Sequence, residues 1–144
     1  MRTDVHRSGP RRPLRGLVPA LAVVTALVYV AEFVIPVAAY PTWLYVGPLT
    51  LPTVALSPTA LAVAVLVNRG RRFRAGPFGV GDAAIVVLAA LTLLAGVYAV
   101  ADLNLSSGGV FFSGVWVVVV GAVLTAAVLV GAGRSLLRGG ATPE

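Results

Sequence analysis

The stretch NRGRRFRAG at residues 68–76 separates two long apolar halves of the chain and contains Arg69, Arg71, Arg72 and Arg74. Arginines that flank a membrane-spanning segment are retained on the cytoplasmic side during insertion. We therefore interpret these four arginines as topology-determining. The expected structure at residues 68–76 is a cytoplasmic loop that connects two transmembrane hairpins.

The composition of the chain is typical of an integral membrane protein. Of its 144 residues, 58% are hydrophobic and 11% are charged, against roughly 25% charged residues in a soluble domain. A soluble domain of this size buries only about 70% of the surface that its unfolded chain exposes, which leaves too much apolar surface in contact with water. The composition predicts an all-α integral membrane protein.

Four apolar runs predict four transmembrane helices, arranged as two hairpins, at about residues 17–35, 51–67, 83–101 and 110–130. A hydrocarbon core of about 30 Å requires roughly 20 apolar residues in a helix. Residues 1–16 and 132–144 then form two tails. All eleven arginines lie in the tails or at residues 68–76, and none lies in the outer loops. This distribution predicts cytoplasmic N and C termini in the cell (plasma) membrane.

Three features of this assignment have alternative interpretations. Residues 37–39 resemble a signal-peptide cleavage site, although the preceding apolar run is long and contains Glu32. Pro58 lies inside the second span, which is either one kinked helix or two shorter pieces. Residues 26–32 and 95–102 share a tyrosine that precedes an acid, which fits either a duplicated hairpin or chance similarity.

Two further local structures are expected from residue types. Tyr40, Trp43 and Tyr45 in the first outer loop predict an aromatic belt at the lipid headgroups. Asp82 precedes the third apolar run, where a carboxylate can accept hydrogen bonds from the free N–H groups of a helix N-terminus. We therefore expect Asp82 to be the N-cap of a helix that begins at Ala83.

Glu32 is the main candidate for a functional residue, because an acid within a membrane span is costly and usually functional. Thr25, Tyr29 and Glu32 follow a spacing of four and three residues and share one helical face. This face is a candidate site for an ion, a proton or a polar ligand. Asp102, at the end of the third span, is a second candidate. Its competing role is turn formation, and that of Glu32 is contact with the headgroups or with Trp43 or Tyr45.

Several classes of chemistry have no residues to support them. The chain has no cysteine, and its only histidine is His6, so the sequence predicts no metal site, no cofactor and no enzymatic activity. In a soluble protein the net charge of +6 would favour a nucleic-acid partner. Here the expected partner is the lipid bilayer with its anionic headgroups, and not nucleic acid.

Small residues in the last two spans predict close helix packing. Such residues are spaced four apart at Gly121 and Thr125, Ala122 and Ala126, and Ala95 and Ala99. They are expected to contact another helix of the chain or a neighbouring subunit.

The leading functional hypothesis is a non-enzymatic subunit or assembly partner of a membrane complex. The alternative is a small oligomeric transporter or channel that uses an intramembrane carboxylate.

Overall fold

The structure is a computed structural model that describes residues 13–35, 39–74, 76–105 and 110–140. Helix α1 (Pro13–Tyr29) continues into a π-helical turn, η1 (Val30–Val34). Two short strands, β1 (Trp43–Val46) and β2 (Leu49–Pro52), form an antiparallel hairpin. They are followed by α2 (Thr53–Phe73), α3 (Val80–Leu105) and α4 (Val110–Gly139).

Four helices of the described residues are long and apolar enough to cross a membrane. The apolar segments are Gly16–Val34, Thr53–Phe73, Val80–Leu105 and Gly114–Gly139, between 19 and 26 residues long. At about 1.5 Å of rise per residue, each reaches about 30 Å or nearly so. The chain therefore has the architecture of a multi-pass membrane protein.

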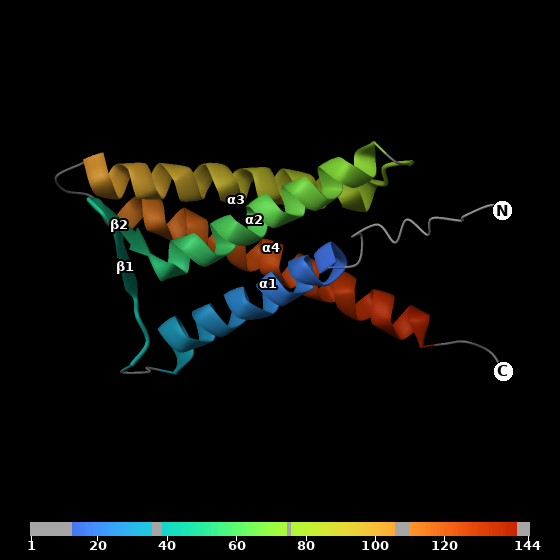
Figure 1. Cartoon of the computed structure of the whole chain (residues 1–144), viewed down its shortest axis with the longest axis horizontal. Coiled ribbons are helices and arrows are strands. Elements are labelled where there is room, and N and C mark those ends of the chain that lie inside the picture. The colour runs from blue at the N-terminus through green and yellow to red at the C-terminus, as the bar shows by residue number, and fades with distance from the viewer. Residues whose placement is uncertain (1–12, 36–38, 75, 106–109, 141–144) are drawn as a thin grey trace, which may run out of the picture.

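Successive helices run in opposite directions, and α2 and α4 lie between α1 and α3 (Figure 1). The larger buried cluster is built around Leu61, Val65 and Leu124, which pack against the small residues Ala22 and Ala89. A second cluster joins Ala55, Val117 and Ala99 nearer the hairpin. Long apolar side chains are exposed on all four helices, which is the surface expected in contact with lipid.

The hairpin was not expected, because an all-α fold leaves residues 37–50 as a loop. Leu44 pairs with Leu51 and Tyr45 with Thr50, and the turn between the strands contains Gly47 at a φ of +61°. A positive φ favours glycine because glycine has no Cβ. The two-stranded sheet therefore belongs to the fold in addition to the four helices.

The prediction of a loop at residues 68–76 was wrong for most of that stretch. Arg69, Arg71 and Arg72 lie inside α2, and Arg74 follows its last residue. The predicted span ended where the apolar residues end, at Val67. Arginine is a good helix former, so the helix continues beyond its apolar part. For the same reason α1 and α4 extend into the predicted tails, to Pro13 and Gly139.

Helix α2 continues through Pro58 without interruption, so the second span is one helix and not two pieces. Pro58 is fully buried and packs against α4. One residue later, the Thr59 hydroxyl donates to the carbonyl of Ala55 at 2.6 Å. This bond adds a partner on the turn that the proline weakens.

Asp82 is not an N-cap, because α3 begins at Val80 and Asp82 is its third residue. Its Oδ2 accepts a hydrogen bond from the backbone N–H of Gly79 at 3.4 Å. This is the arrangement in which an acidic third residue reaches back to the residue before the helix. Asp82 also forms an ion pair with Arg69, which joins the start of α3 to the end of α2.

Glycines of α3 and α4 allow the helices to approach closely. A Cβ built on Gly121 would lie 2.6 Å from Cβ of Pro58 and 2.5 Å from the hydroxyl of Tyr29. A Cβ on Gly96 would overlap the Thr59 side chain. Thr125 is buried on the same side of α4 as Gly121, so this pair of small residues packs within the chain. Ala122 and Ala126 are exposed.

Replacing Gly121 by alanine is expected to destabilise the bundle. The added methyl group meets the rigid ring of Pro58, so the helices must separate, at a cost of about 1–3 kcal/mol. The expected result is a lower midpoint of thermal unfolding in mild detergent. The matched control is Gly133→Ala on the same helix, where a Cβ would meet no atom within 4 Å. Equal midpoints for the two variants would contradict the packing described here.

Candidate functional site

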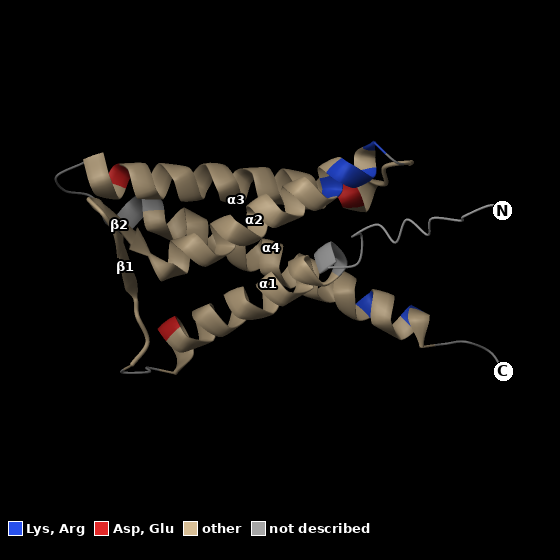
Figure 2. Ribbon diagram, in the orientation of Figure 1, with Lys and Arg blue, Asp and Glu red and all other residues tan. Residues whose placement is uncertain are grey.

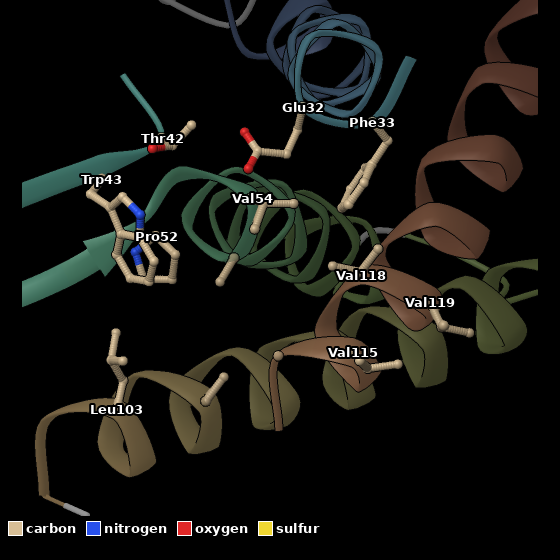
Figure 3. Close-up of a pocket in the computed structure, with 13 residues that line it drawn as sticks. Glu32, Phe33, Thr42, Trp43, Pro52, Val54, Leu103, Val115, Val118 and Val119 are labelled. Atoms are coloured by element: carbon tan, nitrogen blue, oxygen red, sulfur yellow. The ribbon is translucent and has the colours of Figure 1, made fainter. Parts of the chain in front are cut away.

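A cavity of about 350 Å³ lies at the end of the bundle that carries the hairpin. Residues of η1, the hairpin, α2, α3 and α4 form its wall (Figure 3). Apolar side chains make up most of the wall, among them Phe33, Trp43, Pro52, Val54, Leu103 and Val118. Polar side chains of the wall are those of Thr42 and Glu32. We refer to this cavity as the Glu32 pocket.

Glu32 points from η1 into the space between Thr42 and Val54 (Figure 3). Its Oε2 atom is buried and has no hydrogen-bond partner among the described residues. The suggested bonds from Trp43 or Tyr45 to this oxygen are therefore absent from the described structure. A buried acceptor without a partner costs about 1–3 kcal/mol, and more if it is charged. The pocket is consequently suited to a group that donates a hydrogen bond.

The backbone at Glu32 is wound more widely than an α-helix. The N–H of Ile35 donates to the carbonyl of Val30 at 2.8 Å, which is a bond across five residues. Single π-helical turns inside α-helices are often found at functional sites, because the extra residue redirects the neighbouring side chains. This turn places both Glu32 and Phe33 in the wall of the pocket.

The hairpin covers one end of the pocket and is anchored at two places. At its base, the N–H and the hydroxyl of Thr53 both donate to the carbonyl of Thr42, at 3.0 and 3.1 Å. Further along, the Asn104 side chain forms two hydrogen bonds with Thr50 of β2. Its Oδ1 accepts from the N–H at 2.9 Å, and its Nδ2 donates to the carbonyl at 3.2 Å. These bonds hold Trp43 and Pro52 in the pocket wall.

Asn104 was missed as a site residue, because the sequence indicated only a turn. Helix α3 instead continues to Leu105, so Asn104 and Asp102 both lie in its last turns. The Asn104 amide also donates to the carbonyl of Val100 at 2.7 Å, which fixes its orientation. No pattern in the sequence connects Asn104 to Thr50, 54 residues away. Part of the predicted outer loop, residues 106–109, lies outside the described residues.

The other candidate residues of the face of α1 contact different helices. Thr25 is fully buried, donates to the carbonyl of Leu21 at 2.8 Å and lies 2.9 Å from the hydroxyl of Ser57 on α2. Tyr29 donates to the carbonyl of Val118 on α4 at 3.3 Å. Both residues attach α1 to the bundle, and neither lines the Glu32 pocket.

Asp102 lies at the same end of the molecule as Glu32 but on a different side of the bundle. Figure 2 shows the acidic residue of η1 and that of the last turns of α3 on the two outer helices. Asp102 is not part of the wall of the Glu32 pocket. The structure thus does not bring the two carboxyl groups into one site.

The chemistry of the pocket is that of one carboxyl group in mostly apolar surroundings, with the Thr42 hydroxyl and the Trp43 indole as the other polar groups of the wall. One carboxyl group can accept hydrogen bonds from a neutral donor or pair with one cationic group. The residues around it do not supply the several oxygen ligands that Mg²⁺ or Ca²⁺ prefers. Within the described residues, no group of three or more His, Cys, Asp or Glu side chains comes together.

Comparison with protein-family models, with curated proteins and with solved structures found no match. No residue role can therefore be transferred from another protein to this chain. The assignment of the site depends on the geometry around Glu32, and on the hydrogen bonds that hold the hairpin over it.

Replacing Asn104 by alanine is expected to detach β2 from α3. The N–H and carbonyl of Thr50 both lose their side-chain partner, and each lost hydrogen bond weakens local structure by about 0.5–1.5 kcal/mol. The expected result is at least roughly tenfold faster amide hydrogen exchange at Thr50. Asn104→Asp keeps the acceptor for the N–H and should have a smaller effect. Unchanged exchange in Asn104→Ala would show that the hairpin is held without this side chain.

Proposed function

We propose that the chain is an integral protein of the cell membrane, formed by two hairpins with both termini on the cytoplasmic side. Support comes from the distribution of charge. The described arginines gather at one end of the bundle, at the end of α2 and the last turns of α4 (Figure 2). The hairpin at the opposite end contains no basic residue. Retention of arginine on the cytoplasmic side orients the molecule with the Glu32 pocket outward.

We propose that the chain works as a non-enzymatic subunit of a membrane complex, and that a partner supplies a hydrogen-bond donor to Glu32. The observation that carries this proposal is the buried Oε2 atom without a partner. An intramembrane acid usually pairs with another polar group or faces a water-filled cavity. Within the described residues no polar group pairs with Oε2, so a donor supplied by a partner would complete the site.

The position of the pocket favours a partner that approaches from the side. Phe33 of η1 and Val115 of α4 belong to its wall and are more than half exposed, at 62% and 53%. In a spanning orientation these side chains face lipid, whose tails have no hydrogen-bond donor. A transmembrane segment of a partner can bring a donor to this position, and polar contacts between helices stabilise association by about 0.6–2 kcal/mol.

The second candidate is a small oligomeric transporter or channel that uses Glu32 for a proton or a cation. It is supported by the same carboxyl group, because intramembrane acids mark ion and proton paths. Between the Glu32 pocket and the opposite end of the bundle, however, the core is filled by the side chains of Leu61, Val65 and Leu124. A path for ions would then run between subunits of a homo-oligomer and not through a single chain.

The subunit proposal is tested by identifying the chains that purify with the protein in mild detergent. Glu32→Ala is expected to lose a stoichiometric second protein or to retain less than about a tenth of it. The matched control is Leu27→Ala, an exposed apolar position of α1 that does not line the pocket. This control is expected to keep the partner. A partner that remains with both variants would exclude Glu32 as the contact.

The transporter proposal is tested with the purified chain in liposomes that carry a pH gradient. Glu32→Gln keeps the shape of the side chain and removes its ionisable group, so this variant should lose a pH-dependent flux if Glu32 transfers the ion. Asp102→Asn is the comparison at the second acid. An unchanged flux in Glu32→Gln would contradict transport through this residue. A homo-oligomer without any second protein would favour transport over the subunit proposal.

A further inference from the structure

A second, more polar cavity lies at the arginine end of the molecule, far from Glu32. It has a volume of about 240 Å³ and is enclosed by α1, α2, α3 and α4. Its polar side chains are Asn68, Arg69 and Arg72 of α2 and Ser135 of α4. Apolar residues form the rest of the wall, among them Val18, Val65, Ile85 and Val128. We refer to it as the basic pocket.

The two arginines of the basic pocket lie close enough for their charges to interact. They are three residues apart on α2 and both line the cavity, so an anion between them is attracted by both charges. Arg69 is held by its ion pair with Asp82, which uses Nη1 of its guanidinium group. A guanidinium group has five N–H donors, so Arg69 can bind a second anion. Within the described residues, Arg72 forms no ion pair.

The polar side chains beside the arginines complement a headgroup that carries hydroxyl groups. The Ser135 hydroxyl donates to the carbonyl of Ala132 at 2.7 Å, so its oxygen is available as an acceptor. The side-chain amide of Asn68 has no hydrogen bond within the described part of the chain, and it can donate and accept. The basic pocket therefore provides cationic donors, an amide group and a hydroxyl oxygen, and the rest of its wall is apolar.

An apolar groove continues from the basic pocket along α1 and α2. It has a volume of about 280 Å³ and shares two wall residues, Val18 and Asn68, with the basic pocket. The rest of the groove is apolar except for Arg71, and it includes Leu17, Val63 and Ala64. A charged pocket joined to an apolar groove matches a molecule with an anionic head and a hydrocarbon tail.

We propose that the basic pocket and this groove bind one anionic phospholipid. Its phosphate lies between Arg69 and Arg72, its headgroup hydroxyls contact Asn68 and Ser135, and one acyl chain follows the groove between α1 and α2. Basic pockets between helices on the cytoplasmic side of a membrane bind anionic headgroups in this manner. The site is separate from the Glu32 pocket and does not depend on the function proposed for it.

The proposal is tested by titrating the full chain in a neutral detergent with phosphatidylglycerol or with phosphatidylcholine of the same acyl chains. The expected result is an affinity about fivefold or more higher for the anionic lipid, since one arginine near a membrane surface contributes about that factor. Arg72→Gln is expected to lose most of this preference. The matched control is Arg138→Gln, which removes the same charge from the last turn of α4 outside both cavities.

Equal losses in Arg72→Gln and Arg138→Gln would overturn the proposal, because they would indicate general attraction to positive charge. A second variant tests the groove: Ala64→Leu fills it and is expected to weaken binding of both long-chain lipids. Millimolar inorganic phosphate, compared with chloride at equal ionic strength, distinguishes a lipid from a free anion. Full displacement of the lipid by phosphate alone, or unchanged binding in Ala64→Leu, would exclude a lipid-specific site.

Discussion

The need to hydrogen-bond every backbone N–H and C=O group within the chain governs this structure, because lipid offers no partners. The four long helices meet this need except at their ends and at Pro58 of α2. The hairpin does not, since a two-stranded sheet leaves two open edges. At Thr50, the Asn104 side chain supplies both a donor and an acceptor to one such edge. The same side chain thereby fixes the cover of the Glu32 pocket, so a backbone requirement determines how the candidate site is closed.

Close packing in the middle of the bundle separates the two ends. Gly121 lets α4 approach Pro58 of α2 and Tyr29 of α1, and the Tyr29 hydroxyl bonds to α4. Just beyond these contacts α1 changes to the wider η1 turn, and the Glu32 pocket opens there. At the other end, Arg69 and Asp82 join α2 to α3 beside the basic pocket. Each end therefore has a cavity of its own chemistry, one acidic and mostly apolar, the other cationic.

The sequence predicted the number and approximate position of the helices, because long apolar runs have few other structures available to them in lipid. It misplaced the helix ends, since apolarity reports contact with lipid, whereas a helix ends where its hydrogen bonding ends. Arg69 to Arg72 show the difference, because they are polar and still helical. Glu32 was predictable as a lone acid in an apolar run. Its surroundings were not, because the π-helical turn, the hairpin and the bond from Asn104 to Thr50 depend on contacts between distant segments.

The two cavities are suited to ligands of opposite character: one to a hydrogen-bond donor and the other to an anion. Glu32 needs a donor, and its pocket is covered by the hairpin at the end of the bundle but bordered on its side by exposed Phe33 and Val115. Arg72 needs an anion, and its pocket lies in the arginine end of the bundle, where anionic headgroups are found if that end is cytoplasmic. A single soluble ligand cannot satisfy both. A lipid from one side and a polar transmembrane partner from the other would satisfy both, and both are found in the membrane that the four long apolar helices indicate.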